Sequence, residues 1–143
     1  MLKNYTLVIC RRSVIDEEGQ PRAQVLLGMK KRGFGVNKYN GFGGKVESNE
    51  TMREAAAREL EEESGLRAKE LTMRGSLLFF MRESCKIMNV GVYECWDFSG
   101  DPCETEEMIP EWFDETSLPL ESMWPDDAHW MPCLLGTSNF AGR

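Results

Sequence analysis

Residues 44–66, GKVESNETMREAAARELEEESGL, encode a helix with a marked start and a marked end. Thr51 is followed three residues later by Glu54, which is the spacing of a capping box that opens a helix. Gly65 supplies the end, because glycine readily adopts the left-handed conformation that closes many helices. An apolar stripe at helical spacing is formed by Met52, Ala56 and Leu60. We therefore expect this helix to pack with one face on a sheet.

The same helix ends in four carboxylates, those of Glu59, Glu61, Glu62 and Glu63. A helix C-terminus carries the negative end of the helix dipole, so each carboxylate there costs about 0.3 to 1 kcal/mol. At about 100° per residue, Glu62 and Glu63 both lie within about 60° of Glu59, so these three share one face. A bound divalent cation is the natural compensation, and the alternative is a solvated acidic face.

Composition favours one small domain. A chain of 143 residues with 41% apolar content can bury one core, so we expect a single domain over residues 1–143. The net charge of −7 argues against a general basic surface for a nucleic acid polymer. Five cysteines without a C-x-x-C pair favour reduced thiols, each a small buried hydrophobe.

The apolar run at residues 7–10 is too short for a signal peptide or a membrane span. We therefore expect a soluble, monomeric, cytoplasmic protein without a membrane partner, with the nucleus or the mitochondrion as alternative locations.

Strand-like and helix-like segments alternate along the chain. The predicted strands cover residues 5–10, 25–29, 77–81, 90–96 and 112–113. A polar loop is expected at residues 16–21 and a turn at residues 83–85. A second helix begins near residues 125–127 and runs toward Leu135. This order predicts an α/β fold, an α/β/α sandwich with a mixed β-sheet between helices.

The spacing of Gly44, Glu50, Arg58-Glu59, Glu62-Glu63 and Gly65-Leu66 matches the Nudix box, G-x5-E-x7-R-E-U-x-E-E-x-G-U with U aliphatic, without departure. The chain therefore resembles the Nudix hydrolases, whose box implies hydrolysis of a nucleoside diphosphate linked to another group. The runs VLLGMKKRGFG, NGFGGKV and MWPDD, at residues 25–35, 40–46 and 123–127, resemble more closely the mammalian-type members that hydrolyse oxidised purine nucleoside triphosphates. That resemblance implies cleaning of the nucleotide pool, with products of a monophosphate and pyrophosphate.

The resemblance also implies a metal site. Glu59, Glu63 and the carbonyl of Gly43 would bind Mg²⁺ or Mn²⁺, and Glu107 would add a carboxylate. The metal would neutralise the triphosphate and acidify an attacking water, which Glu63 or Glu62 would orient or deprotonate.

Other groups near the box support this expectation. Arg58 would fix a box carboxylate by a two-pronged pair, with a surface ion pair as the alternative, while Glu50 serves the loop or a further metal. Glycines at positions 41, 43 and 44 would let the backbone approach a metal, and a tight strand turn is their alternative explanation. Lys30 resembles a family position in the pocket and would steer the triphosphate inward, although a solvated lysine is the default.

Base recognition would fall to three polar residues. The amide of Asn40 can both donate and accept, so it can meet a purine edge with two hydrogen bonds. Asp126 and Asp127, if both are buried, would hold one proton between them and so accept oxidised guanine and oxidised adenine alike, as in 8-oxo-dGTP and 2-hydroxy-dATP. A helix N-cap is the alternative for this pair.

Apolar walls are expected from Trp124, Phe34, Phe79, Met81 and Met108, for which ordinary core packing is the alternative. Thr6 would reach the pocket rim or else sit in a strand, and the single histidine, His129, is expected to be structural. Three departures from the family concern substrate preference and stability rather than hydrolysis: a longer loop at residues 11–24, Met81 where an aromatic is expected, and a tail that stops at residues 138–143 with a sheet edge unpaired.

Two alternatives to the favoured function stay open. The same chemistry could act on methylated purine triphosphates, unmodified dNTPs or another nucleoside diphosphate derivative. The other alternative is a binding module without turnover. Loss of box carboxylates would be its sign, but every box carboxylate is present here.

Overall fold

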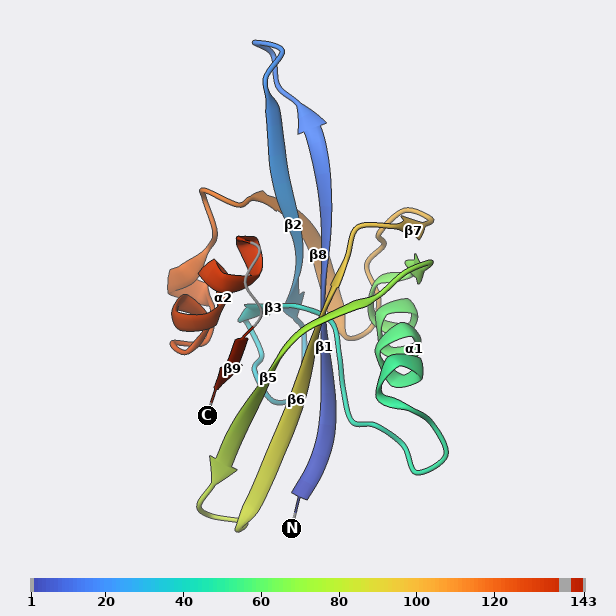
Figure 1. Cartoon of the computed structure of the whole chain (residues 1–143), viewed down its shortest axis with the longest axis vertical. Helices are drawn as coiled ribbons and strands as arrows, with labels where there is room; N and C mark the ends of the chain where they lie inside the picture. Colours follow the sequence, from blue (N-terminus) through green and yellow to red (C-terminus); the bar gives the residue numbers. More distant parts are fainter. Residues whose placement is uncertain (1, 137–139, 143) are drawn as a thin grey trace.

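The computed structural model describes residues 2–136 and 140–142, and shows a twisted mixed sheet between two helices (Figure 1). The main sheet contains β1 (Leu2–Ile15), β2 (Pro21–Lys30), β3 (Tyr39–Asn40), β5 (Thr72–Met81), β6 (Lys86–Cys95), β8 (Met108–Asp114) and β9 (Phe140–Gly142). The helices are α1 (Met52–Ser64) and α2 (Asp127–Leu135), and a short 3₁₀ turn covers Leu120–Ser122. A separate ladder joins β4 (Arg67–Ala68) to β7 (Phe98–Ser99). The predicted α/β sandwich is confirmed.

Strand β1 occupies the middle of the sheet. The strand order is β3-β2-β1-β6-β5-β9, and β8 pairs with β2. Strand β1 runs antiparallel to β2 but parallel to β6, which makes the sheet mixed. Phe42, between β3 and α1, forms a bridge to Val8 of β1, so the glycine-rich segment before the box is held against the central strand.

Helix α1 begins and ends where the sequence predicts. The Thr51 hydroxyl accepts the Glu54 backbone N–H at 3.1 Å, and the Glu54 carboxylate accepts the Thr51 backbone N–H at 2.9 Å. Gly65 has a φ of 82°, and its N–H donates to the carbonyl of Glu61. Both caps are therefore confirmed, and Ala56 and Leu60 are fully buried beneath the helix.

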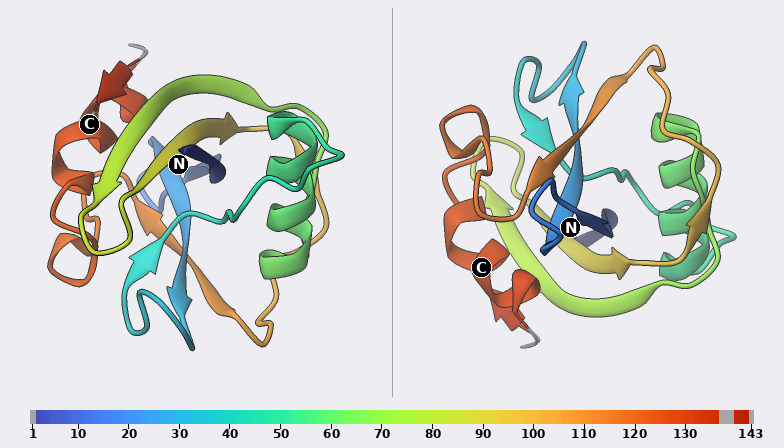
Figure 2. Two further views of the ribbon diagram at one scale, coloured as in Figure 1. Left: turned by 90° about the horizontal axis from the view of Figure 1, so that it is seen from below. Right: turned by 90° about the horizontal axis from the view of Figure 1, so that it is seen from above.

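Each face of the sheet carries its own apolar core. Val8, Leu26 and Phe42 pack with α1 on one face, whereas Ile9 and Val92 pack with α2 on the other. Alternate residues of β1 thus point to opposite cores, as strand geometry requires. Figure 2 shows the two helices on opposite sides of the sheet.

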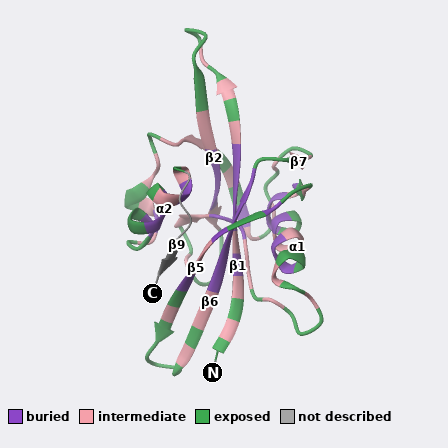
Figure 3. Cartoon of the chain, viewed as in Figure 1, coloured by how far each residue is buried: buried purple, intermediate pink, exposed green. Residues whose placement is uncertain are grey.

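The segment at residues 11–24, expected as a longer loop, is mostly strand. Ser13 pairs with Ala23 and Ile15 with Pro21, so only residues 16–20 lie outside β1 and β2. Asp16 closes this turn by accepting the backbone N–H groups of Glu18 and Gln20, each within 2.9 Å. The resulting hairpin extends from the body and is largely exposed (Figure 3). The polar loop predicted at residues 16–21 is therefore confirmed except for Pro21, whereas the longer loop at residues 11–24 was wrong, because the residues on either side of the turn pair with one another across the two strands.

Two further expectations change. Cys10 and Cys95 are buried, but Cys85 and Cys103 are exposed, so the description of every cysteine as a buried hydrophobe was wrong. All five thiols are free.

In the tail, β9 pairs in parallel with residues 75–77 of β5, so this part of the edge is covered rather than unpaired. Positions 138, 139 and 143 of the tail lie outside the described residues. None of the helices in the described ranges is long and apolar enough to cross a membrane.

Candidate active site

The last turns of α1 lie against the glycine pair that precedes the helix. The Glu63 carboxylate is 6% exposed and accepts the Gly43 backbone N–H at 2.9 Å. A Cβ at Gly44 would stand 2.6 Å from the Glu59 carboxylate carbon, so only glycine leaves room for that carboxylate. A Cβ at Gly43 would overlap the Thr6 carbonyl oxygen of β1. The glycines therefore allow helix, loop and strand to meet at the carboxylates.

Burial disfavours the charged forms of the Glu59 and Glu63 carboxylates. Burial raises the pKa of Glu63 from its usual 4.5 to about 7, and the nearby Glu59 adds to the rise. The Gly43 N–H and Lys30 oppose it without cancelling it. Burial likewise raises the pKa of Glu59, against the effect of Arg58. A carboxylate that titrates near neutral pH, as Glu63 does, is suited to proton transfer. A cation would stabilise the charged forms of both Glu59 and Glu63.

Arg58 organises the outer side of this cluster. Its guanidinium makes a two-pronged contact with Glu50 at 2.7 and 3.1 Å, and hydrogen bonding from Arg58 lowers the pKa of Glu50. The same guanidinium reaches Glu59 at 2.8 Å and the exposed Glu62 at 3.3 Å. Its two-pronged partner is thus Glu50, while Glu59 receives a single contact.

Glu107 lies beside two cations. Lys30 Nζ is 2.8 Å from Glu107 Oε2 and 4.0 Å from Glu63 Oε2, and Arg32 Nε is 2.9 Å from Glu107 Oε1. Hydrogen bonding from Lys30, and then from Arg32, lowers the pKa of Glu107. Within the described ranges, no three Asp, Glu, His or Cys side chains are grouped so that they could hold a metal ion. The carboxylates of Glu59, Glu63 and Glu107 lie in one region. Each accepts a hydrogen bond from a different donor: Arg58, the Gly43 N–H and Lys30, respectively.

The expected base side is built around Trp124. Phe34 stacks on Trp124 with ring centroids 5.1 Å apart and an interplanar angle of 24°, although Phe34 is 76% exposed. Lys38 Nζ lies 5.2 Å from the Trp124 ring centroid. Gly35 has a φ of 85°, and a Cβ there would stand 3.4 Å from Trp124. The loop after β2 thus packs on the ring that the sequence singled out.

Asp127 is the buried acid of the MWPDD run. Its carboxylate accepts the Trp124 backbone N–H at 3.2 Å and the Trp130 indole N–H at 3.1 Å. Burial raises the pKa of Asp127 to about 6 despite these donors. Asp126 is exposed, so the expectation of two adjacent buried carboxylates was wrong. Neighbouring residues at a helix start point about 100° apart, so one can be buried while the other faces water.

Asp126 occupies the N-cap position of α2, but its side chain makes no capping hydrogen bond within the described structure. Sequence reasoning missed Trp130 as a hydrogen-bond donor to Asp127. Its spacing of three residues from Asp127 in a predicted helix was the available signal.

The remaining predicted residues differ in their surroundings. The Asn40 side-chain carbonyl accepts the Gly41 N–H at 2.8 Å, and the Thr6 hydroxyl is buried without a hydrogen-bond partner in the described chain. Phe79 is partly buried in the core beneath α2, and Met81 is 38% exposed. Met108 is 4% exposed and packs in the core with Phe42, which agrees with the alternative of ordinary core packing.

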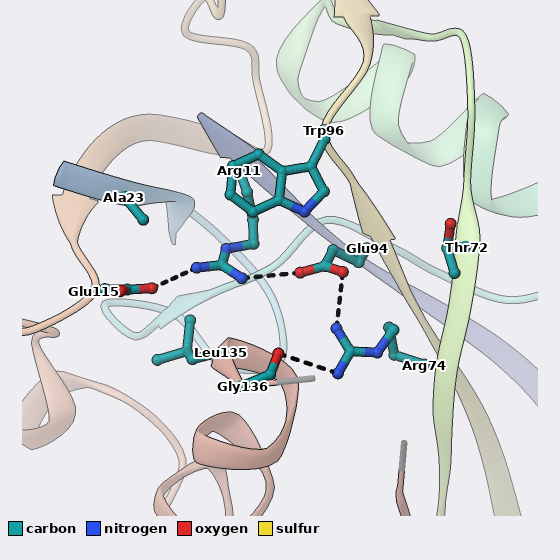
Figure 4. Close-up of a pocket in the computed structure, with 9 residues that line it drawn as sticks. All are labelled: Arg11, Ala23, Thr72, Arg74, Glu94, Trp96, Glu115, Leu135 and Gly136. Carbon is teal, nitrogen blue, oxygen red and sulfur yellow. Dashed lines mark hydrogen bonds and ion pairs between the residues drawn. The ribbon is translucent and has the colours of Figure 1, made fainter. Parts of the chain in front are cut away.

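A second polar cluster lies in a depression that contains none of the predicted site residues (Figure 4). Glu94 joins two buried arginines, accepting from Arg11 at 2.9 Å and from Arg74 at 2.8 Å. Arg74 also donates to the Leu134 carbonyl at 3.0 Å, near the end of α2. Arg11 also contacts Glu115 of the segment after β8. This cluster ties the C-terminus of α2 to the sheet, and nothing in the sequence indicated these pairings.

Comparison with known proteins gives matches over most of the chain. The family model described as NUDIX domain matches residues 8–134. The mouse (Mus musculus) protein named oxidized purine nucleoside triphosphate hydrolase is 46% identical over 139 residues, which are 97% of this chain and 83% of that protein. The zebrafish (Danio rerio) protein of the same name is 46% identical over 119 residues, which are 83% of this chain and 76% of that protein. Among solved structures, the MutT mutator protein of Bacillus halodurans has a TM-score of 0.72 at 22% identity, over 96% of this chain and 85% of that one, and so shares the fold.

Proposed function

The chain belongs to the Nudix family, and from this membership we propose that it hydrolyses oxidised purine nucleoside triphosphates. The expected substrates are of the 8-oxo-dGTP and 2-hydroxy-dATP type, and the products are the monophosphate and pyrophosphate. The observation that carries the proposal is the pair of carboxylates at the end of α1, where Glu59 and Glu63 lie against Gly43 and Gly44. These contacts support a common site for the two box carboxylates.

Nudix hydrolases generally use divalent metal ions, and for this chain we propose Mg²⁺, with Mn²⁺ as a substitute. The ion would be held by the carboxylates of Glu59, Glu63 and Glu107 and by the Gly43 carbonyl, all of which are hard oxygen donors. These carboxylates are not grouped closely enough in the described chain to hold an ion, so binding would have to draw them together. A bound ion of this kind neutralises phosphate charge and acidifies an attacking water. The fit is supported by Gly44, because any side chain there would take the place of the Glu59 carboxylate.

Glu63 is the residue that we assign as the general base. In the metal-free protein its carboxylate is buried and burial raises its pKa to about 7, in the range in which a carboxylate can take a proton from water and release it again. Glu62 is less suited, because its side chain is 58% exposed and bonds to Arg58. The Gly43 N–H fixes one oxygen of Glu63, so the other oxygen is the one that would meet the water.

Base selection is proposed for the residues around Trp124. Trp124 supplies the stacking surface with Phe34. Asp127, with a pKa of about 6, is present in both protonation states near neutral pH and can therefore accept from or donate to a purine edge. Asn40 keeps its amide N–H groups for the same edge, because its carbonyl is engaged by Gly41. Thr6 offers a buried hydroxyl with unused hydrogen-bonding capacity in the described structure.

The test is release of pyrophosphate with Mg²⁺ across a panel of oxidised, methylated and unmodified purine nucleotides. We expect the oxidised triphosphates to give the highest kcat/KM, and Glu63→Gln to lose roughly 10²- to 10⁴-fold in kcat, the range for removal of a general base. A preference for methylated or normal nucleotides would replace the substrate but keep the chemistry. Tight binding of oxidised nucleotides without any release would instead identify a binding module.

We further propose a monomeric single domain over residues 1–143 that works in the cytoplasm. The free thiols and the net charge of −7 support a reducing compartment and a small-molecule substrate rather than a polymer. Light scattering after size exclusion would test the monomer.

A further inference from the structure

Lys30 is placed by main-chain hydrogen bonds at the end of β2. Its backbone N–H donates to the Lys38 carbonyl at 3.0 Å, and its carbonyl accepts the Asn37 N–H at 2.9 Å. Pairing of Lys30 with Met108 sets the residue beside the first position of β8. Glu107 immediately precedes that position, so the strand register itself brings the ammonium to this carboxylate.

The ammonium of Lys30 stands between two acidic side chains from different elements. Its Nζ is 2.8 Å from Glu107 Oε2 and 4.0 Å from Glu63 Oε2. The Lys30 side chain is 23% exposed and the Glu63 side chain only 8%, so water screens this pair weakly. One cation is thus already paired with two of the carboxylates that the proposed function gives to a metal.

We propose that Lys30 is an internal counter-ion that competes with a divalent cation for Glu63 and Glu107. A cation that binds both carboxylates must displace the ammonium, because the two positive charges repel and share the same oxygen atoms. The proposal rests on the proposed function for the identity of the metal-binding carboxylates. Its consequence is that loss of Lys30 should strengthen metal binding, whereas a lysine that only binds substrate would leave metal affinity unchanged.

Lys31 provides a matched control for the charge itself. It is adjacent in sequence and carries the same charge, but its Nζ contacts Glu104 at 2.6 Å and the Thr105 carbonyl at 2.9 Å. Removing either lysine changes the net charge by one unit, and of the two side chains only that of Lys30 contacts the carboxylates of Glu63 and Glu107. The backbone N–H of Lys31 donates to the Glu107 carbonyl at 2.8 Å, and a change to Met keeps that donor. A difference between Lys30→Met and Lys31→Met therefore separates direct competition from the general field of the protein.

The experiment is a Mn²⁺ titration of the full chain without nucleotide, read from the electron paramagnetic resonance signal of unbound Mn²⁺. We expect Lys30→Met to bind Mn²⁺ roughly tenfold more tightly than the wild type, the size expected for removing one competing charge-assisted hydrogen bond. Lys31→Met should stay within about twofold of the wild type, as expected for a charge without this contact. In a Glu107→Gln background, the gain from Lys30→Met should fall, because one of the two contested carboxylates is gone.

Equal or weaker Mn²⁺ binding by Lys30→Met would overturn the proposal, and so would an equal gain in Lys31→Met or an undiminished gain in the Glu107→Gln background. Circular dichroism checks that each variant folds, and Lys30→Gln replaces Lys30→Met if the latter does not. In the wild type, Mg²⁺ should shift the lysine ¹H–¹⁵N ammonium signal that Lys30→Gln lacks, and an unmoved signal would also contradict competition. Hydrolysis of the nucleotide panel is measured on the same wild-type preparation, so a failure of the proposed function is seen separately from the Mn²⁺ result.

Discussion

When the buried carboxylate of Glu63 is ionised, it should lower the free energy of unfolding relative to a chain with a neutral side chain at this position. The variant Glu63→Gln tests this. Burial raises the pKa of Glu63 in the folded protein from 4.5 to about 7. Between these two values the folded state binds more protons than the unfolded state, so stability is lost as the pH rises through that window. A rise of this size corresponds to about 3 kcal/mol above neutral pH, since each pKa unit is worth about 1.4 kcal/mol.

The full value is an upper limit for the glutamine variant. A glutamine side chain at this position cannot reproduce the pairing of the carboxylate, because its amide oxygen would accept from Gly43 while its amide nitrogen would face Lys30, which is also a donor. We therefore expect Glu63→Gln to stabilise the protein by about 1 to 2 kcal/mol at about pH 8 in EDTA, after this loss is subtracted. Toward about pH 4, where Glu63 is protonated in both states, only the loss of pairing remains, so the variant should be less stable than the wild type by about 1 to 2 kcal/mol.

The assay is urea unfolding followed by tryptophan fluorescence, at several pH values with EDTA present throughout. Glu62→Gln is the matched control, because Glu62 is the neighbouring box carboxylate and its side chain is 58% exposed. That variant should change the free energy of unfolding by no more than about 0.5 kcal/mol at any pH. A stability difference for Glu63→Gln that does not rise between about pH 4 and pH 8, or that is still negative at about pH 8, would refute the reasoning, even if the variant had lost its activity.

Other contacts give three more predictions. Arg74→Met should lower the free energy of unfolding by about 3 kcal/mol in urea titrations, because it removes a buried partner of Glu94 and the donor to the end of α2; a loss no larger than that of a surface substitution would contradict this account. Because the pKa of Asp127 is raised to about 6, KM for an oxidised purine nucleotide should change between about pH 5 and pH 7, and Asp127→Asn should flatten that profile; a variant with an unchanged profile would exclude Asp127 as the group that titrates. Thr51→Ala should cost about 1 kcal/mol of stability with kcat unchanged, since it removes only the hydroxyl that caps the Glu54 N–H, and calorimetry alongside steady-state kinetics would reveal any other result.

Much of the fold was accessible from the sequence because its signals are local. The caps of α1 depend on residues three positions apart, and the apolar stripe depends on the helical repeat, so neither requires knowledge of the rest of the chain. Parts of β1 and β2 and the C-terminal halves of β5 and β6 were predicted in the same way from their composition. The full lengths of the strands were not predicted. Pairing extended β1 and β2 through a polar stretch and made β8 seven residues long.

The candidate site divides in the same manner. The sequence placed Glu59, Glu62 and Glu63 on one helix face, but it could not say that Glu63 is buried while Glu62 is exposed. It also named Asp126 and Asp127 together, whereas only Asp127 is buried, where it accepts the Trp124 backbone N–H and the Trp130 indole N–H.

What the sequence by itself determined was the helix with its two caps and its row of carboxylates, together with the family that this spacing identifies. The tertiary structure decided which charges meet: Lys30 with Glu107 across 77 residues, and Arg11 with Glu94 across 83. The physical reason is that helix spacing is set by bonds between near neighbours. Burial and nearby charges change the pKa of a side chain through space. Only the folded chain fixes which side chains are close enough to interact in this way.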